Sequence, residues 1–288
     1  MARTDPKNWS DYWWDRHTPG LSLMRADFTT HCYPAHSHDA FVIAVTEDGG
    51  SVIRSRGSDE EARTSTLFVF NPAEPHAGWM GRSERWRYRS LYLTQEAIDA
   101  VARGLGVDAV PYFTRNLFAD PDLIDAFLAL HRTLQDGSDL FEQRERLLAS
   151  FGVLFRRHGN GGLRIAPAPR DRARLDRTIA RMQDAHDQPL HLDDLAAAAD
   201  VTAFQLIGLF KRATGLTPHA YLTRVRLHAA CRALRRGTPP AEAAVLCGFY
   251  DQSALNRHFK RCYGITPLQF AHAARAVNFR QYDLRQSA

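Results

Sequence analysis

The sequence predicts an α+β protein of two domains, with a β-rich N-terminal half and an all-α C-terminal half. Three observations support this division. Residues 20–95 contain short runs of β-branched and aromatic residues, and a twelve-residue segment occurs twice, 49 positions apart, near the C-terminus. Between the halves, residues 157–169 are rich in Gly and Pro, which is typical of a linker. A chain of 288 residues is long enough for two domains that each have a core.

Five segments of the N-terminal half are predicted to be strands, because they alternate or are β-rich and are separated by turn residues. They are Leu21–Ala26, Phe41–Val45, Ser51–Ser55, Thr66–Asn71 and Arg87–Leu93. Two apolar stripes at helical spacing follow the strands. The first stripe consists of Leu123, Ile124, Phe127, Leu128 and Leu134, and the second of Leu140, Leu147, Leu148, Phe151, Leu154 and Phe155. Either stripe can be core against the strands.

The repeated segment lies at the end of a helix-turn-helix pattern in both copies. In the first copy a helix over residues 192–199 ends before Thr202, which forms a capping-box pattern with Gln205. The helix that follows is expected to stop at Gly215. In the second copy Pro240–Leu246 is the first helix, residues 247–250 are the turn and Asp251–Tyr263 is the second helix. The second turn contains a glycine, Gly248, that the first turn lacks.

One connecting helix is predicted between the copies, over Tyr221–Arg236. Its sixteen residues span about 24 Å, a length suited to holding two recognition helices about one DNA turn, roughly 34 Å, apart. Charge also separates the halves: residues 170–288 contain 18 Lys and Arg against 10 Asp and Glu, whereas residues 1–169 contain 19 against 22. A basic C-terminal domain is expected where only that domain meets phosphates.

These residues resemble the AraC/XylS family of bacterial transcription regulators. The resemblance rests on the doubled Phe-Lys-Arg-x-x-Gly-x-Thr-Pro-x-x-aromatic pattern, on residues 248–253 before the second copy, and on Arg226 and Leu227 in the connecting helix. It covers about a hundred residues. It implies an N-terminal cupin-like β-barrel with helices, which binds an effector over residues 1–158, a linker over 159–171 and a double helix-turn-helix domain over 172–288. It also implies double-stranded promoter DNA as partner, a small-molecule effector, contact with RNA polymerase, and a homodimer in which the second apolar stripe pairs the subunits.

The second helix of each unit is expected to read the major groove. Helical spacing gives its outward stripe, and the candidate DNA-contacting residues are Phe204, Gln205, Ile207, Gly208 and Lys211 in the first unit and Gln252, Ser253, Asn256, Arg257 and Lys260 in the second. Arg can pair with guanine, and Asn or Gln with adenine. The first stripe departs from the family pattern because it is mostly apolar. Either Phe204 and Ile207 contact thymine methyl groups, or the first unit mainly binds phosphates.

Three histidines, His36, His38 and His76, flank the predicted strands. In metal-dependent cupins a His-x-His pair, a nearby glutamate and a later His supply the ligands, but residues 41–43 here are Phe-Val-Ile where the glutamate would fall. We therefore expect no metal and no cofactor. The three histidines and Trp79, with Trp86 nearby, are candidates for contact with an effector at the mouth of the barrel. The alternative is that the histidines pack in turns and bond to backbone.

Neither a signal-peptide pattern nor an apolar run of membrane-spanning length is present, so a cytoplasmic protein without a membrane partner is expected. Four cysteines without metal or redox spacing fit reduced thiols. The sequence thus predicts a transcription regulator that is not an enzyme. Two alternatives remain open, a cupin metalloenzyme with an appended DNA-binding domain and a ligand-independent DNA-binding regulator.

Overall fold

The computed structural model describes residues 8–137, 139–161, 166, 171–263 and 265–272. They fall into two compact units, one formed by Met1–Gly137 with Arg146–Ala166 and the other by Ser138–Glu145 with Pro167–Ala288. Most of the predicted linker, residues 159–171, and the end of the predicted DNA-binding domain lie outside the described residues. The predicted domain boundaries therefore stay predictions, and each unit is described here by itself.

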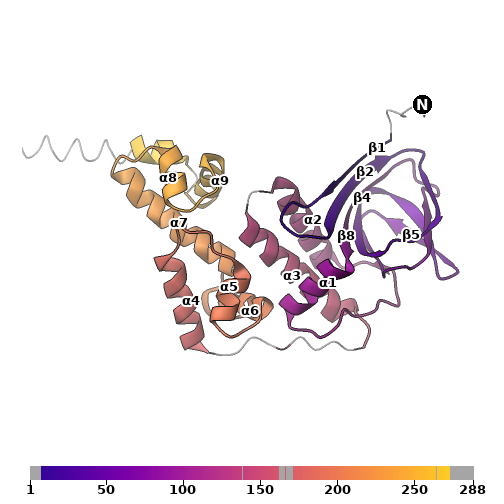
Figure 1. Cartoon of the computed structure of the whole chain (residues 1–288). Coiled ribbons are helices and arrows are strands. Elements are labelled where there is room, and N and C mark those ends of the chain that lie inside the picture. The colour runs from indigo at the N-terminus through magenta and orange to yellow at the C-terminus, as the bar shows by residue number, and fades with distance from the viewer. Residues whose placement is uncertain (1–7, 138, 162–165, 167–170, 264, 273–288) are drawn as a thin grey trace, which may run out of the picture. The chain divides into compact units, whose positions relative to one another are not determined.

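The first unit is a cupin-like β-sheet domain (Figure 1). Its main strand order is β1-β2-β8-β4-β6-β9, all antiparallel, while β3 pairs with β7, and β5 and β7 pair with β4. The strands are β1 (Trp9–Trp14), β2 (Leu21–Phe28), β3 (Cys32–His36), β4 (Ala40–Ser55), β5 (Ser58–Arg63), β6 (Thr66–Phe70), β7 (His76–Trp79), β8 (Trp86–Thr94) and β9 (Leu117–Phe118). All five predicted strand segments are confirmed as strand, except that β6 ends at Phe70, one residue before the predicted Asn71.

The two segments Phe41–Val45 and Ser51–Ser55 belong to one strand, β4, and the turn predicted between them is wrong. The first half of β4 pairs with β6 and β8 and its second half with β5 and β7, with a register shift between Thr46 and Asp48. Gly49 makes this bend possible, because its φ is 72° and a Cβ there would overlap the backbone oxygen of Arg85. The glycines thus bend a continuous strand instead of ending it.

Side chains alternate between the two faces of the sheet along each strand, so residues of both faces can be buried. One face carries Phe41 of β4, whose ring lies 6.1 Å from Phe151 and 6.5 Å from Phe155. Those two phenylalanines belong to α3 (Leu140–His158), which with α1 (Gln95–Leu105) and α2 (Pro121–Asp136) follows β8 in the chain, with β9 between α1 and α2. Of the second apolar stripe, only Leu140 is exposed, and the other five side chains are fully buried. Of the two roles expected for the stripe, the structure therefore supports core, because its buried side chains are not available to pair two subunits.

The second unit contains the predicted pair of helix-turn-helix units (Figure 1). Its helices are α4 (Arg172–Asp184), α5 (Leu192–Ala198), α6 (Ala203–Thr214), α7 (Pro218–Arg235), α8 (Pro240–Leu246) and α9 (Gln252–Tyr263). α6 begins with the predicted capping box of Thr202 and Gln205 and ends at Gly215, whose φ is 72°. The connecting helix α7 is longer than predicted because Thr217 caps it and Pro218 starts it. Across the described part of the chain, none of the helices combines the length and the apolar character that a bilayer span requires.

The turns of the two helix-turn-helix units share one backbone motif. Val201 donates its amide to the carbonyl of Ala196, and Phe249 donates its amide to the carbonyl of Ala244, which is the long-range bond of a Schellman ending. The left-handed residue of the first turn is Asp200, with φ 53°, and that of the second is Gly248, with φ 81°. The first turn therefore replaces the absent glycine by an aspartate, a residue that tolerates this conformation.

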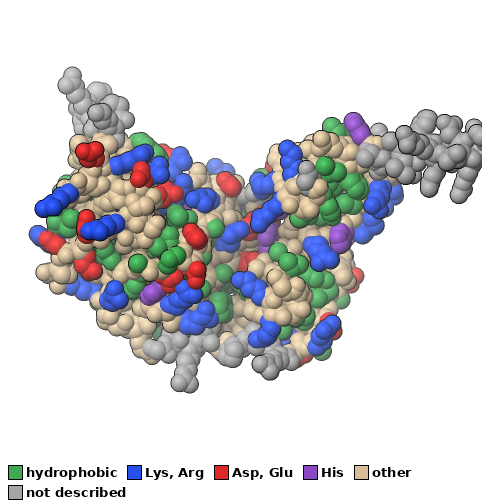
Figure 2. Space-filling model, turned by 180° about the vertical axis from the view of Figure 1, so that it is seen from behind, with side chains coloured by type: hydrophobic (Ala, Val, Ile, Leu, Met, Phe, Trp, Pro, Cys, Tyr) green, Lys and Arg blue, Asp and Glu red, His purple; other side chains and the backbone are tan. Residues whose placement is uncertain are grey.

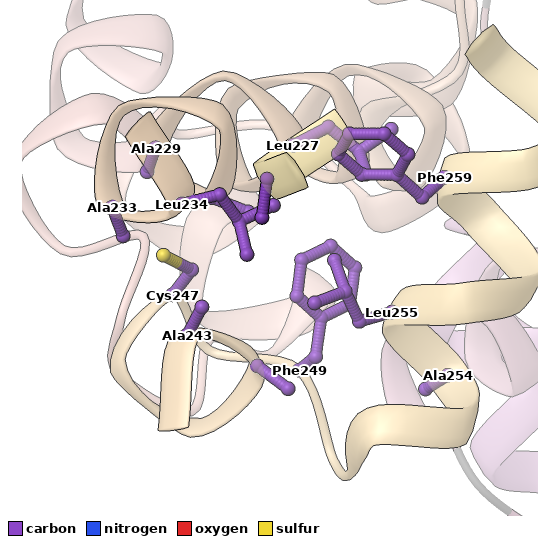
Figure 3. Close-up of a cluster of buried hydrophobic side chains, with 13 residues drawn as sticks. Leu227, Ala229, Ala233, Leu234, Ala243, Cys247, Phe249, Ala254, Leu255 and Phe259 are labelled. Carbon is purple, nitrogen blue, oxygen red and sulfur yellow. The ribbon is translucent and has the colours of Figure 1, made fainter. Parts of the chain in front are cut away.

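One apolar cluster anchors the second helix-turn-helix unit on α7 (Figure 3). Leu227 and Leu234 of α7 point toward the second helix-turn-helix unit, where Leu255 and Phe259 of α9 are fully buried. Arg226, on the same helix, donates to the carbonyl oxygens of His186 at 2.8 Å and Gln188 at 3.2 Å. α7 therefore anchors α9 through the apolar cluster and, through Arg226, the segment that follows α4. The four cysteines are free, as the sequence predicts.

Candidate nucleic-acid interface and ligand cavity

The outward face of α9 is polar and open. Gln252, Ser253, Arg257 and Lys260 are exposed and Asn256 is half-buried, while the opposite face of the helix buries Ala254, Leu255 and Phe259. The spacing of three and four residues therefore separates a core stripe from a polar stripe, as the sequence predicts. This face presents one guanidinium, one ammonium, two amides and a hydroxyl, all groups that bind phosphates or base edges.

The matching face of α6 differs. Lys211 is exposed, whereas Phe204 and Gly208 are half-buried. Ile207 is only 3% exposed, so the expectation that it faces outward is wrong. The reason is that Ile207 follows the buried Ala203 by four residues and Leu206 by one, which places it at the border of the core stripe.

Gln205, the remaining candidate of α6, serves the start of the helix. Its side-chain oxygen accepts from the backbone amide of Thr202 at 2.9 Å, and its backbone amide donates to the Thr202 hydroxyl at 3.1 Å. The structure therefore brings the five α9 candidates together on one surface, whereas on α6 Ile207 is buried, Gln205 caps the helix and Lys211 is exposed. Burial and capping, which helical spacing alone does not reveal, account for the difference.

Basic side chains are distributed over the second unit, and acidic ones are more frequent on the first (Figure 2). This agrees with the charge difference between residues 170–288 and residues 1–169. Since the phosphate backbone attracts Lys and Arg regardless of base sequence, the unit that carries α6 and α9 is the one suited to meet DNA.

The first unit contains a cavity of about 300 Å³ between the two layers of strands. It is lined mostly by apolar and aromatic side chains together with a smaller number of polar groups, as is usual for sites of small ligands. The lining residues are Tyr12, Met24, Tyr33, His36, His38, Val42, Ile53, Phe68, Phe70, His76, Ala77, Gly78, Trp86, Tyr88, Ser90 and Tyr92.

The three predicted histidines meet in this cavity. His36 of β3 lies directly opposite His76 of β7 in the antiparallel register, and His38 follows His36 by two residues. The ring centroids are 4.5 Å apart for His36 and His76, 4.8 Å for His36 and His38, and 5.2 Å for His38 and His76. Burial, with the neighbouring rings of His76 and His36, lowers the pKa of His38 to about 4. Burial likewise lowers the pKa of His76. These two rings are therefore neutral at pH 7.

A buried carboxylate holds the turn before β7. Glu74 accepts hydrogen bonds from Ser55 and Asn116 on one oxygen and from Asn71 and Arg56 on the other, all between 2.7 and 3.1 Å. Burial alone would raise the pKa of Glu74, but the hydrogen bonds from Arg56, Asn116, Asn71 and Ser55 together lower it to about 2. The network fixes the backbone of Glu74, whose carbonyl oxygen accepts from Nδ1 of His76 at 2.9 Å.

Trp79, the fourth ligand candidate, does not line the cavity. The guanidinium of Arg54 lies 5.1 Å from the centroid of its ring. Because His76 and Gly78 face the cavity, the alternation of β7 turns Trp79 away. Trp86 on β8, the other tryptophan expected near the mouth of the barrel, does line the cavity.

Sequence reasoning missed the tyrosines of the cavity. The hydroxyls of Tyr33 and Tyr88 are 2.7 Å apart, and Tyr92 lies 5.3 Å from His38 between ring centroids. Burial raises the pKa of Tyr92 to about 12 and raises that of Tyr88 well above its usual value, so both hydroxyls stay protonated. The signal was present as a period of two in β8, where Trp86, Tyr88, Ser90 and Tyr92 alternate with residues that face the other side of the sheet.

Comparison with known proteins assigns a domain to each unit. Residues 18–151 match an AraC-like ligand binding domain, and residues 195–273 match a helix-turn-helix domain. The chain is similar to the HTH-type transcriptional regulator YbfI of Bacillus subtilis, 25% identical over 223 residues that make up 77% of this chain and 80% of that one. It is also similar to the probable transcriptional regulator LumQ of Photobacterium leiognathi, 37% identical over 78 residues, 27% of this chain and 32% of that one. The chain thus spans about four fifths of YbfI but about a third of LumQ.

Among solved structures, the DNA-binding domain of AdpA in complex with a target DNA is 29% identical; the match covers 35% of this chain and 93% of that one, with a TM-score of 0.35. The two domain matches, each on the unit that holds the corresponding site, identify the chain. It belongs to the AraC/XylS family, as a transcription regulator that joins an AraC-like ligand-binding domain to a DNA-binding helix-turn-helix domain.

Proposed function

We propose that this regulator binds double-stranded promoter DNA mainly through α9, under the control of a small effector held in the cavity of the first unit. The observation that carries the proposal is the exposed polar face of α9, placed where the second helix of a helix-turn-helix unit reads the major groove. Fewer of the candidate residues are exposed on α6, where Lys211 is exposed and basic whereas Ile207 is buried. We therefore assign base recognition chiefly to α9 and phosphate binding chiefly to α6.

Arg257 tests this assignment. Replacing Arg257 with alanine removes the one guanidinium of the predicted α9 stripe, so we expect a loss of about 1–3 kcal/mol in binding to the specific site. The measurement is a gel-shift titration of the full chain on its own promoter fragments and on a panel of fragments with single base changes, all at one salt concentration. The loss should be confined to targets that keep the base read by Arg257, so that the variant discriminates less at that position.

Two further variants control the test. Arg177→Ala removes the same charge from an exposed position of α4 and should weaken specific and random DNA by similar factors. Ile207→Val trims one buried methyl group and should lower stability by about 1 kcal/mol without changing the sequence preference. The assignment to α9 fails if Ile207→Val relaxes the preference more than Arg257→Ala does.

The remaining parts of the proposal concern partners. We infer that the effector is a compact molecule with an aromatic or apolar body, because the cavity measures about 300 Å³ and its walls are largely aromatic. We also propose a homodimer, contact with RNA polymerase, a cytoplasmic location and no enzymatic activity, in keeping with the domain matches. A ligand that raises the unfolding temperature of the chain and changes its affinity for the promoter fragment would identify the effector. A ligand that raises the unfolding temperature but leaves the affinity for the promoter fragment unchanged would not be the effector.

A further inference from the structure

The geometry points to a divalent transition-metal site at His36, His38 and His76, with the open positions of the ion facing the cavity. Each histidine offers one ring nitrogen, and the three atoms all lie within 4.8 Å of one another. Two nitrogens bound to one tetrahedral ion at about 2.05 Å are roughly 3.3 Å apart. The rings would therefore have to approach by about 1.5 Å at most, which side-chain rotation supplies.

The backbone brings these three side chains together. His36 and His76 are cross-strand partners in β3 and β7, and His38 lies just past the end of β3, with its ring 4.8 Å from that of His36 and 5.2 Å from that of His76 between centroids. The ring of His76 is also stacked on Phe70, at 3.7 Å between centroids and 4° between planes. Two of the three ligands thus stand on paired strands, which hold ligands more firmly than loops do.

The hydrogen bonds of two rings settle which nitrogen can bind the ion. Nδ1 of His36 contacts the carbonyl oxygen of Pro34 at 2.7 Å, and Nδ1 of His76 contacts that of Glu74 at 2.9 Å. A carbonyl oxygen only accepts, so Nδ1 carries the proton in both rings. In the neutral ring the lone pair is then on Nε2. A donor bond from the other nitrogen is the usual support of a metal-binding histidine.

The expectation of no metal rested on the missing glutamate, but three nitrogen ligands are enough for a site that keeps an open position. The nearby carboxylate of Glu74 is not available, since Ser55, Arg56, Asn71 and Asn116 occupy its oxygens. Imidazole ligands suit Zn²⁺ and its first-row neighbours. The open position faces the tyrosine-lined cavity, so the matching effector would be one that offers an oxygen or nitrogen donor to the ion.

The test is a metal titration of the full chain after dialysis against a chelator. We expect about one Zn²⁺ per chain to remain after gel filtration, and Co²⁺ to give the visible absorption of a low-symmetry, four- or five-coordinate site. His38→Gln and, separately, His36→Gln should each lower the affinity for Zn²⁺ at least about tenfold. Both positions are only half-buried, so these variants are expected to fold, which far-ultraviolet circular dichroism checks.

The matched control is His17→Gln, an exposed histidine outside the cavity, which should bind Zn²⁺ as the unmodified chain does. The inference is overturned if the unmodified chain retains no Zn²⁺, or if His17→Gln lowers the affinity as much as His38→Gln. Binding of promoter DNA is measured separately on the same preparations. A chain that binds Zn²⁺ through these histidines but no DNA would uphold the metal site and contradict the proposed function.

Discussion

Replacing Glu74 with glutamine is expected to destabilise the first unit by about 3 kcal/mol at neutral pH. The side chain is 6% exposed and pairs with Arg56 at 2.8 Å, and glutamine would turn an amide donor toward groups that already donate. Unfolding by urea, followed by tryptophan fluorescence, measures the effect in this unit alone. The five tryptophans all belong to it, namely Trp9, Trp13, Trp14, Trp79 and Trp86.

The same substitution should remove a pH dependence. The folded pKa of Glu74 is about 2 against an ordinary value of 4.5, so the stabilisation is complete above pH 4.5 and is lost as the pH falls toward 2. Glu74→Gln should therefore lose less stability than the unmodified chain between pH 5 and pH 3. Glu61→Gln is the matched control, because Glu61 pairs with Arg63 at a side-chain exposure of 55% and should change stability by less than about 0.5 kcal/mol. Equal effects of the two variants would contradict the role of Glu74.

Gly248→Ala is expected to cost about 3 kcal/mol in the second unit and to abolish tight DNA binding. The φ of Gly248 is 81°, and a Cβ would overlap the carbonyl oxygen of His186 and lie 2.9 Å from Nε of Arg226. The left-handed strain is about 1–2 kcal/mol, and displacing the Arg226 bond to His186 adds about 1.5 kcal/mol. Thermal unfolding followed by the helical circular dichroism signal, together with a gel shift, checks both effects.

The first helix-turn-helix unit supplies the control for Gly248. Asp200 occupies the same left-handed place with φ 53°, and its exposed ion pair with Arg174 contributes little. Asp200→Gly should therefore leave stability unchanged or raise it by up to about 1 kcal/mol. If Gly248→Ala were tolerated as well as Asp200→Gly, the close approach of His186 and Arg226 would not constrain the turn.

The helical unit was largely predictable because its signals are local. Pro240–Leu246 is helical over its predicted bounds, and the capping box at Thr202 and the stop at Gly215 place the ends of α6. Sequence reasoning did not predict α4, and it placed Ile207 on the wrong face. Spacing gives the direction of a side chain, but burial depends on which neighbours the tertiary structure brings beside it.

The β unit was less predictable because its strands depend on distant partners. β3, β5 and β7 contain charged, proline and histidine residues and become strands by pairing with each other or with β4. The meeting of His36 with His76 follows from that pairing, so sequence could name the three histidines without showing that they converge. Trp79 was misplaced for the same reason, since the phase of β7 is set by its neighbours.

The unlike faces of α6 and α9 give the molecule a direction. The two helices follow one another in a single chain. The face of α9 is polar and exposed whereas that of α6 is partly buried, so no two-fold axis relates the two faces. A target that fits both is not a palindrome. A bound chain would then have a head and a tail along the duplex, and inverting its target within a promoter would reverse which end of the protein faces the gene.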